Sequence, residues 1–253
     1  MSESGFRDLF SRDSASYARF RPRYPPALFA WLATLPAARR TAWDCASGNG
    51  QAATLLTAHF QRVVGTDASL AQLRAAGRSD RLGYTACLAE QAALASASID
   101  LVTVAQAFHW LDRERFYGEV SRVIAPGGAF AVVGYARLRA EPAIQEAVHH
   151  FQDRTVGSYW PPERELVEAG FAGIPIPIDE AKPPAFSIES RLTLQELLGY
   201  VGTWSAVGRY REQTGQDPMP LLERELEPLW GSPDLPRRIE WPLFLRAGRW
   251  IAS

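Results

Sequence analysis

Short apolar runs alternate with amphipathic segments between residues 40 and 135. Several runs are apolar at successive positions, which is typical of parallel strands covered on both faces. Between the last two of these runs, apolar residues recur at helical spacing, and Pro126-Gly127-Gly128 ends the predicted helix. This alternation predicts an α/β domain with a doubly wound, mostly parallel sheet. The predicted strands are TAWDCA (41–46), RVVGTD (62–67), LGYTACL (82–88), IDLVTVAQAF (99–108) and GGAFAVVGY (127–135).

The pattern changes after Tyr135. Residues 142–155 have helical periodicity, and AFSIE (185–189) is typical of a strand. Alternating apolar residues predict a last strand over 239–245. Pro242 is unfavourable within it, because proline lacks the N–H that pairing in a sheet requires.

A long helical segment separates the last two predicted strands. It covers residues 190–237 and opens with a capping box formed by Thr193 and Glu196. Hairpin connections usually need only roughly two to five residues. We therefore expect 190–237 to be an inserted helical cap over a substrate site.

Composition and charge exclude several classes of function. The 253 residues carry a formal net charge of −1, which supplies no electrostatic footprint for nucleic acid or an anionic membrane. Four histidines without Cys/His spacing predict no metal site. Cys45 and Cys87 do not suggest a disulfide framework, and no signal sequence or membrane-spanning run is recognisable. We expect a cytoplasmic protein that binds no nucleic acid and no membrane.

The stretch WDCASGNGQAA places a glycine-rich turn between a predicted strand and a predicted helix. Gly48, Gly50 and Ala53 match the dinucleotide fingerprint G-x-G-x-x-G/A. Asp44 with the same glycines also matches, less one glycine, the loop that holds S-adenosylmethionine in methyltransferases. Both interpretations assign Asp67, at the end of the second strand, to ribose hydroxyls. The loop alone leaves hydride transfer and methyl transfer open.

Four features favour the methyl donor. Asp44 precedes the glycines at a strand end, where it can orient the loop or attract the donor's ammonium group. Residues 1–40 precede the first strand, whereas dinucleotide folds often begin with theirs. The Ala-Glu pair at 89–90 follows the third strand, where adenine would lie. The segment VAQAFHW (104–110) ends the fourth strand at the sheet edge where open α/β sheets bind ligands.

Several segments, taken in their order along the chain, resemble those of a known family. The segments are YARFRPRYP (17–25), WDCASGNGQAA (43–53), VVGTDAS (63–69), AE (89–90), VTVAQAFHWLD (102–112), RVIAPGG (122–128), YWPPERELVEAGF (159–171) and GTWSAVGRY (202–210). Together with the last strand they resemble the class I S-adenosylmethionine-dependent methyltransferases of the type 11 group, particularly small-molecule enzymes like trans-aconitate methyltransferase. The resemblance covers nearly the whole chain.

The resemblance implies a Rossmann-like, seven-stranded sheet in a single domain. It implies an N-terminal lid over 1–30, a cofactor-binding core over 40–135 and the cap over 190–237. The cofactor would be S-adenosylmethionine, the product S-adenosylhomocysteine, and the partner a small-molecule methyl acceptor. We expect a monomer or a homodimer.

Two departures from the family pattern concern the cofactor site. Ala46 occupies the first glycine position of the loop, where its methyl group is a small intrusion if φ stays negative. Leu88 stands where many relatives have an acidic residue, so adenine recognition would rest on Glu90, backbone and packing.

The predicted site has a cofactor set and a substrate set. The cofactor set is Tyr17, Arg21, Asp44, Ala46, Ser47, Gly48, Asn49, Gly50, Asp67, Ala68, Ser69, Ala89, Glu90, Gln106 and Ala107. The substrate set is His109, Trp110, Tyr159, Trp160, Trp204 and Arg209. By resemblance, Tyr17 and Arg21 lie near the donor carboxylate.

Structural alternatives stay open for several of these residues. Asp44 could be a strand-end acceptor, and Glu90 could start a helix or face solvent. Tyr159, Trp160 and Trp204 fit a cap core as well as a pocket wall. His109 could be a packed core residue, a ligand contact or a general base.

The expected reaction is methylation of a small organic acid on a carboxylate oxygen. The resemblance supports it, and so does a cluster of arginines in the proposed lid and cap. These arginines are Arg19, Arg21, Arg23, Arg209 and Arg211. Guanidinium groups bind carboxylates in bidentate geometry. The alternatives are a catalytically silent S-adenosylmethionine-binding protein and a nicotinamide-dependent oxidoreductase.

Overall fold

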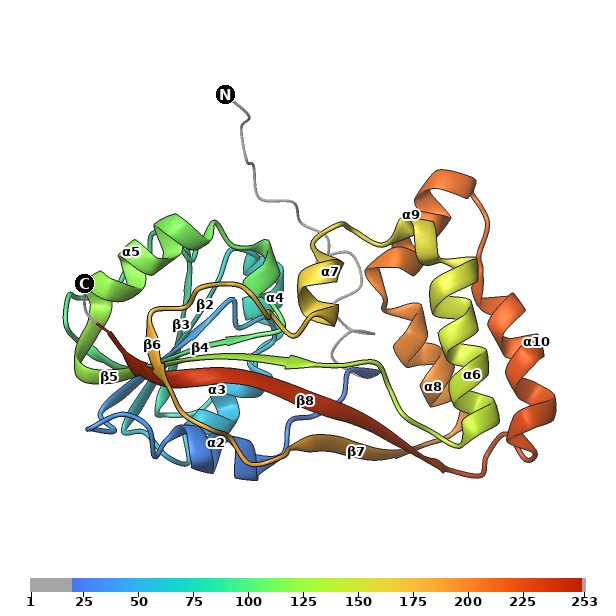
Figure 1. Cartoon of the computed structure of the whole chain (residues 1–253), viewed down its shortest axis with the longest axis horizontal. Coiled ribbons are helices and arrows are strands. Elements are labelled where there is room, and N and C mark those ends of the chain that lie inside the picture. Colours follow the sequence, from blue (N-terminus) through green and yellow to red (C-terminus); the bar gives the residue numbers. More distant parts are fainter. Residues whose placement is uncertain (1–19, 252–253) are drawn as a thin grey trace.

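The computed structural model describes residues 20–251, and the protein folds around one twisted sheet (Figure 1). Its strand order is β3-β2-β1-β4-β5-β8-β6, and β7 pairs with β8 outside this path. The five strands from β1 to β5 are parallel, whereas β8 runs antiparallel to β5, β6 and β7. The strands are β1 (Thr41–Cys45), β2 (Arg62–Asp67), β3 (Leu82–Ala86), β4 (Ile99–Ala105), β5 (Ile124–Tyr135), β6 (Ile178–Glu180), β7 (Ser187–Leu192) and β8 (Arg237–Trp250).

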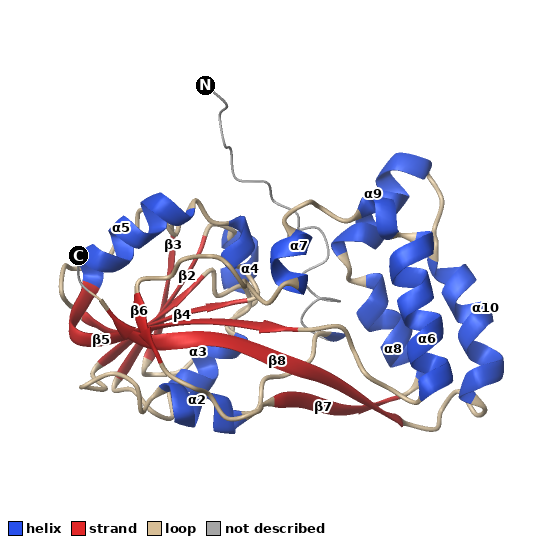
Figure 2. Cartoon of the chain, in the orientation of Figure 1, coloured by secondary structure: helices blue, strands red, loops and turns tan. Residues whose placement is uncertain are grey.

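The predicted fold class is confirmed, and all five predicted parallel strands are present. The sheet has eight strands where seven were expected. The additional strand is the short β6, which the sequence pattern did not indicate. The edge of the sheet is built on β8, a strand of 14 residues. Its second half pairs with β5 and β6, and its first half extends beyond the sheet and pairs with β7. Figure 2 shows β8 leading out of the sheet towards the helices at the other end of the molecule.

Pro242 lies where β8 changes partners. Pro242 pairs with Ser187 of β7, and the next residue, Leu243, pairs with Tyr135 of β5. The carbonyl of Pro242 accepts a hydrogen bond from Ala136 N at 2.8 Å. Because the missing N–H falls at a change of ladder, the strand tolerates this proline.

Helices cover both faces of the sheet, and each face has its own apolar core. One core contains Trp43, Phe108, Phe116 and Phe130. The other contains Leu28, Phe29, Leu56 and Phe60, together with alanines of the central strands. Hence the central strands need apolar side chains on both faces, as their sequence predicts. The flanking helices are α2 (Pro26–Leu32), α3 (Gln51–Leu56), α4 (Leu70–Arg74), α5 (Arg113–Val123) and α7 (Arg164–Glu168).

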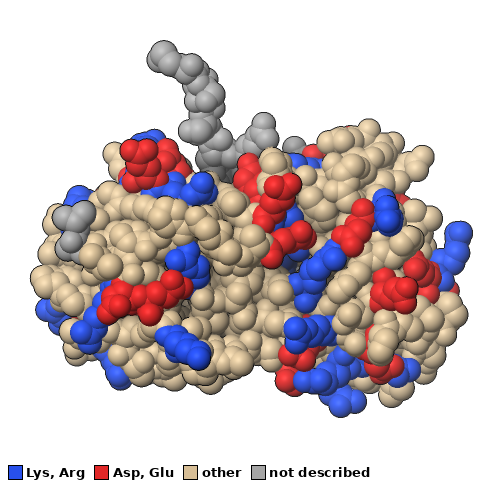
Figure 3. Space-filling model, in the orientation of Figure 1, with Lys and Arg blue, Asp and Glu red and all other residues tan. Residues whose placement is uncertain are grey.

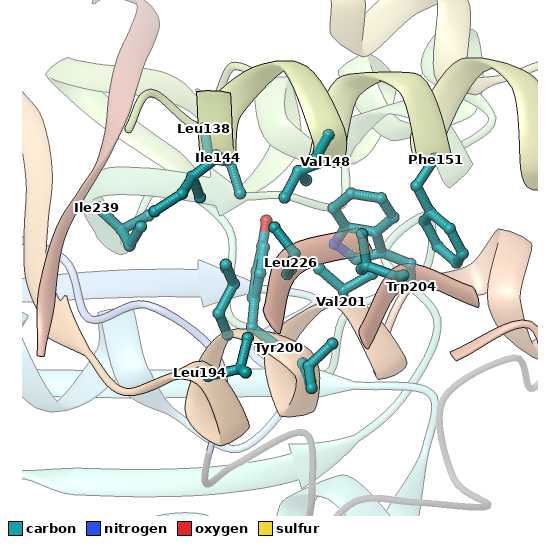
Figure 4. Close-up of a cluster of buried hydrophobic side chains, with 14 of the residues drawn as sticks. Leu138, Ile144, Val148, Phe151, Leu194, Tyr200, Val201, Trp204, Leu226 and Ile239 are labelled. Carbon is teal, nitrogen blue, oxygen red and sulfur yellow. The ribbon is translucent and has the colours of Figure 1, made fainter. Parts of the chain in front are cut away.

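A second group of helices lies beyond the end of the sheet, and we call it the helical module. It consists of α6 (Pro142–His150), the π-helical turn Phe151–Thr155, α8 (Leu194–Gly202), α9 (Ser205–Thr214) and α10 (Met219–Trp230). A separate apolar core holds it together, including Ile144, Val148, Leu226 and Trp204 (Figure 4). The predicted range 190–237 contains α8, α9 and α10, which lie between β7 and β8. It leaves out α6, which packs against α10.

One face of the molecule shows how its charged side chains are distributed. On the face in Figure 3, acidic and basic side chains are interspersed among neutral ones. Within residues 20–251, no helix combines the length and the apolar character needed to cross a bilayer.

Candidate active site

The glycine loop follows β1 and leads into α3 with an unusual backbone. Ala46, Gly48 and Gly50 all have positive φ, at 53°, 56° and 79°. Glycine adopts this region freely, but alanine does so at a cost of about 1 kcal/mol. The condition of negative φ at Ala46 is therefore not met. Alanine here keeps a glycine-like conformation under strain, and the loop retains its curvature.

Asp44 is buried at the end of β1, below this loop. Its carboxylate accepts hydrogen bonds from Ser47 Oγ at 2.6 Å and from Thr103 Oγ1 at 2.8 Å. Burial raises the pKa of Asp44 to about 6, although both hydroxyls oppose the shift. A cation near this carboxylate would favour its ionised form.

Asp67, at the end of β2, fixes the loop from the neighbouring strand. Its Oδ2 accepts from the backbone N–H of Gly48 and its Oδ1 from that of Ser69, each at 2.8 Å. Ser69 in turn caps α4 by accepting from Gln72 N. A carboxylate oxygen can accept more than one hydrogen bond, so these two contacts are compatible with ribose hydroxyls as further donors.

A cavity of about 490 Å³, including space open to solvent, lies against the loop, and we call it the donor cavity. The backbone from Ala46 to Asn49 lines it, together with Asp44 and the start of α3. The carboxyl ends of β4 and β5, with Arg21, Pro22 and Tyr24, complete the wall. A buried carboxylate and a curved backbone at the edge of a parallel sheet fit the methionine end of S-adenosylmethionine.

The residues predicted near adenine lie outside the lining of this cavity. Ala89 is buried, and Glu90 Oε1 accepts from Asp112 N at 2.9 Å. Asp112 caps α5, so Glu90 supports the start of that helix. This contact is a structural role for Glu90 that was not predicted from the sequence. Leu88 is exposed at the same strand end.

A second cavity, of about 720 Å³ with its open space, lies towards the helical module, and we call it the acceptor cavity after the role proposed for it below. Four members of the predicted substrate set line it: His109, Trp110, Trp160 and Trp204. Tyr159 instead packs on Tyr210, with ring centroids 4.9 Å apart. Neither Tyr159 nor Arg209 belongs to the lining of either cavity.

Several lining residues of the acceptor cavity are absent from the predicted set. They are Tyr135, Arg137, Gln152, Arg164 and Tyr200. They come from the end of β5, the π-helical turn, α7 and α8, which are far apart in the chain. The closeness of Arg164 to the predicted Trp160 in the sequence was a usable signal. No local pattern marks the others.

Three arginines line the acceptor cavity: Arg21, Arg137 and Arg164. Arg137 forms an ion pair with Asp153. Arg164 lies over the ring of Trp160, 4.5 Å from its centroid, and pairs with Glu168 at 3.3 Å. The lining, taken from the described residues, contains no acidic side chain. The cavity wall therefore consists of arginine and aromatic side chains, and Arg137 and Arg164 are ion-paired with carboxylates outside the lining.

The two cavities share three lining residues, Arg21, Gln106 and Tyr135, which we call the junction. Arg21 Nη1 donates to Tyr135 Oη at 2.6 Å, and its Nη2 donates to the carbonyl of Thr203 at 3.2 Å. Gln106 has a φ of +58°, held by its backbone N–H bond to Val133 O at 2.9 Å. The side-chain amide nitrogen of Gln106 is buried and has no partner within the described chain.

His109 lies in a 3₁₀ turn, Phe108–Trp110, that follows β4. Its ring packs on that of Trp110, with centroids 4.5 Å apart. Burial, with a smaller contribution from Arg164, lowers the pKa of His109 to about 4. The imidazole is therefore neutral near pH 7, and it is a weak base there.

The arginines predicted from sequence mostly lie elsewhere. Tyr17 and Arg19 fall outside the described residues. Arg23 is exposed, and Arg211 pairs with Asp217 on the surface of the helical module at 2.9 Å. Of the five, only Arg21 lines a cavity within the described part of the chain.

Known proteins are similar to this chain over its catalytic core and over most of its length. The family described as a methyltransferase domain matches residues 43–132. A solved protein of Anaeromyxobacter dehalogenans, named as a type II methyltransferase, is 43% identical, with 91% of this chain and 98% of that one covered and a TM-score of 0.85. A Dictyostelium discoideum protein named as a methyltransferase is 28% identical over 87% of this chain and 86% of its own length. A Saccharomyces cerevisiae protein named as an S-adenosylmethionine-dependent methyltransferase is 22% identical over 92% of this chain and 94% of its own length.

Fold, glycine loop and paired cavities together define a nucleotide-binding α/β transferase. The chain belongs to the class I S-adenosylmethionine-dependent methyltransferases. Its methyl donor is S-adenosylmethionine, so the question left open by the glycine loop is answered in favour of methyl transfer.

Proposed function

We propose that the protein transfers the methyl group to a carboxylate oxygen of a small organic acid. The observation that carries the proposal is the acceptor cavity, which meets the donor cavity at the junction. Arg21, Arg137 and Arg164 line it, its walls are aromatic, and its described lining has no acidic side chain. Arginine matches carboxylate geometry, and a partly apolar surrounding strengthens such pairs.

The donor is assigned to the other cavity. Ala46 to Asn49 would hold its methionine end, Asp44 its ammonium group and Arg21 its carboxylate. Asp67 would accept from the ribose hydroxyls. The sulfonium supplies an electrophilic methyl group when the donor is bound.

The role of the protein is then to position the donor and the acceptor relative to each other. Aligning the acceptor oxygen, methyl carbon and sulfur can lower the barrier by about 7–11 kcal/mol through orientation. The aromatic wall of Trp160 and Trp204 would limit water around the nucleophile. A carboxylate is already ionised at neutral pH, so the reaction requires no base.

A hydroxyl acceptor is the second candidate, and His109 would be its base. Against it stands the pKa of His109, which burial lowers to about 4. A base with that pKa has little driving force for removing a proton from an alcohol or phenol. The neutral imidazole suits a ligand contact better.

The direct test is a methyl-transfer screen with matched acceptors. Aliphatic and aromatic carboxylic acids are each paired with their primary amide, alongside phenols and amines, and S-adenosylhomocysteine release is measured. We expect turnover with acids and none with the paired amides. Turnover confined to phenols or amines would overturn the proposal.

Arginine variants locate the acceptor. Arg137→Gln and Arg164→Gln should each raise the KM for the acid about 10- to 100-fold, as expected for loss of a charged hydrogen bond. Arg211→Gln is the matched control, because it removes an arginine from an ion pair outside the cavity. An equal KM in all three variants would contradict the assignment.

A further inference from the structure

We infer that Gln106 and Tyr135 hold the reacting oxygen of the methyl acceptor by neutral hydrogen bonds, while Arg137 and Arg164 bind acceptor charge away from the reacting atom. This inference rests on the proposed carboxylate acceptor. It assigns different chemistry to the two ends of one site: uncharged donors where the bond forms, and cations farther into the acceptor cavity.

Placement is the first argument. The methyl group must pass from one cavity to the other, and Gln106 and Tyr135 line both of them. Arg137 and Arg164 line the acceptor cavity and are absent from the donor lining. The two arginines are therefore farther from the transferred methyl than the junction residues are.

Unused hydrogen-bonding capacity is the second argument. The Gln106 amide nitrogen is buried without a partner in the described chain. A buried donor left unpaired is costly, so its position calls for a ligand acceptor. Tyr135 Oη accepts from Arg21 at 2.6 Å, which leaves the hydroxyl proton to be donated elsewhere. A hydroxyl polarised by a cation is a stronger donor.

The backbone of Gln106 points the same way. A positive φ of 58° is strained for a residue with a Cβ, and it persists because the N–H is tied to Val133 O. Strain of this kind tends to be stored at functional sites. Here it occurs directly after β4, at the sheet edge where the two cavities meet.

Charge development in the reaction explains why neutral donors suit this position. The carboxylate oxygen forms its bond to the methyl carbon while the carbon–sulfur bond breaks and its electron pair goes to sulfur. A neutral ester and a neutral thioether result, and no proton moves. Because the oxygen loses negative charge on the way, a cation bound to it would stabilise the ground state more than the transition state. Neutral donors orient the oxygen with less of this penalty.

Arg21, the cation of the junction, is engaged in other contacts. Its two terminal nitrogens donate to Tyr135 Oη and to Thr203 O, and its guanidinium lies 5.8 Å from the ring centroid of Tyr200. In the proposed assignment it also serves the donor carboxylate. It thereby acts on the acceptor oxygen through Tyr135.

The test separates the chemical step from binding. Gln106→Met keeps an unbranched side chain of similar length and removes the amide hydrogen-bond donor. Tyr135→Phe removes only a hydroxyl. Single-turnover rates are measured at saturating S-adenosylmethionine and saturating acid, with KM for the acid and Kd for S-adenosylhomocysteine measured separately. Each substitution should lower the single-turnover rate about 10- to 100-fold, the loss typical of a misplaced reactant. Binding of S-adenosylhomocysteine should change less than about threefold.

Arg164→Gln provides the contrast, because it should raise KM and leave the saturated single-turnover rate within about threefold. Circular dichroism of each variant checks that it is folded. A Gln106→Met or Tyr135→Phe enzyme that binds S-adenosylhomocysteine and keeps the wild-type rate would overturn the inference while leaving the proposed acid methylation intact. A wild-type enzyme that methylates no acid would overturn the proposed function itself.

Discussion

The donor and acceptor cavities differ in what they are made of. Backbone of a single loop, between β1 and α3, supplies much of the donor cavity, with strand ends around it. Side chains from at least five separate segments supply the acceptor cavity. A backbone cradle cannot change without changing the fold, whereas side chains in a cavity wall can be exchanged singly. The contrast explains how one fold keeps its cofactor and varies its acceptor.

The largest expected effect comes from breaking the backbone cradle. Gly50 has φ +79°, and a Cβ there would collide with the Tyr84 hydroxyl and lie 3.0 Å from Tyr84 Cζ. Strain and overpacking together should make Gly50→Ala about 2–4 kcal/mol less stable and abolish donor binding. Urea unfolding and calorimetry with S-adenosylhomocysteine check this.

The matched control for that substitution is Gly83→Ala. Gly83 lies on β3, and a Cβ there meets nothing within 4 Å. It should leave stability and donor affinity unchanged within error. Tyr84→Phe combined with Gly50→Ala should recover part of the lost stability. Equal losses at Gly50 and Gly83 would show that the cradle tolerates a side chain.

Next in size is Asp67→Ala, which tests whether the donor cavity depends on this one carboxylate. It removes the acceptor for two backbone N–H groups and, as proposed, for the ribose hydroxyls. Donor affinity should fall by about 1.5–3 kcal/mol, roughly 10- to 150-fold. Calorimetric Kd values for S-adenosylmethionine measure it. An unchanged Kd would remove Asp67 from the donor site.

A smaller effect follows from pH. The pKa of Asp44 is raised to about 6, so its carboxylate becomes protonated as pH falls through that value. The cationic donor prefers the ionised form, so its affinity should decrease about tenfold from pH 7.5 to pH 5. Asp44→Asn should flatten this dependence. Equal slopes in wild type and variant would show that Asp44 does not face the donor charge.

The smallest effect is expected at His109. With a carboxylate acceptor no base is needed, so His109→Gln should lower the saturated rate only a few-fold, with little change in the pH profile from 5.5 to 8.5. A hydroxyl acceptor would predict a loss of about 10²–10⁴-fold. Single-turnover rates across that range distinguish the two.

The two cavities also differ in how far the sequence predicts them. Regular strand–helix alternation predicts the sheet. The spacing of Asp44, Gly48 and Asp67 predicts the glycine loop and the carboxylate that fixes it. The positive φ of Ala46 was not predictable, because it follows from the curvature of the whole loop. The eighth strand, β6, has only 3 residues, too few for a strand pattern to be recognised in the sequence.

The acceptor cavity was predicted only in part, for a physical reason. Trp160 and Trp204 were proposed as substrate-site residues, with a cap core left open as the alternative, and both line the cavity. Arg137 and Gln152 meet only because the π-helical turn returns to the end of β5. Such convergence depends on packing of α6 against α10, which no local pattern encodes.

The chemical nature of the methylated product tests the central proposal most directly. Enzyme is incubated with donor carrying a tritiated methyl group and with an acid acceptor found in the screen, and the product is then treated with mild alkali. A carboxylate ester releases the label as volatile methanol. If Arg164→Gln yields less of this methanol at low acceptor concentration, the acceptor binds in the acceptor cavity. We expect nearly all transferred label to be alkali-labile. Label that resists alkali would contradict carboxylate methylation.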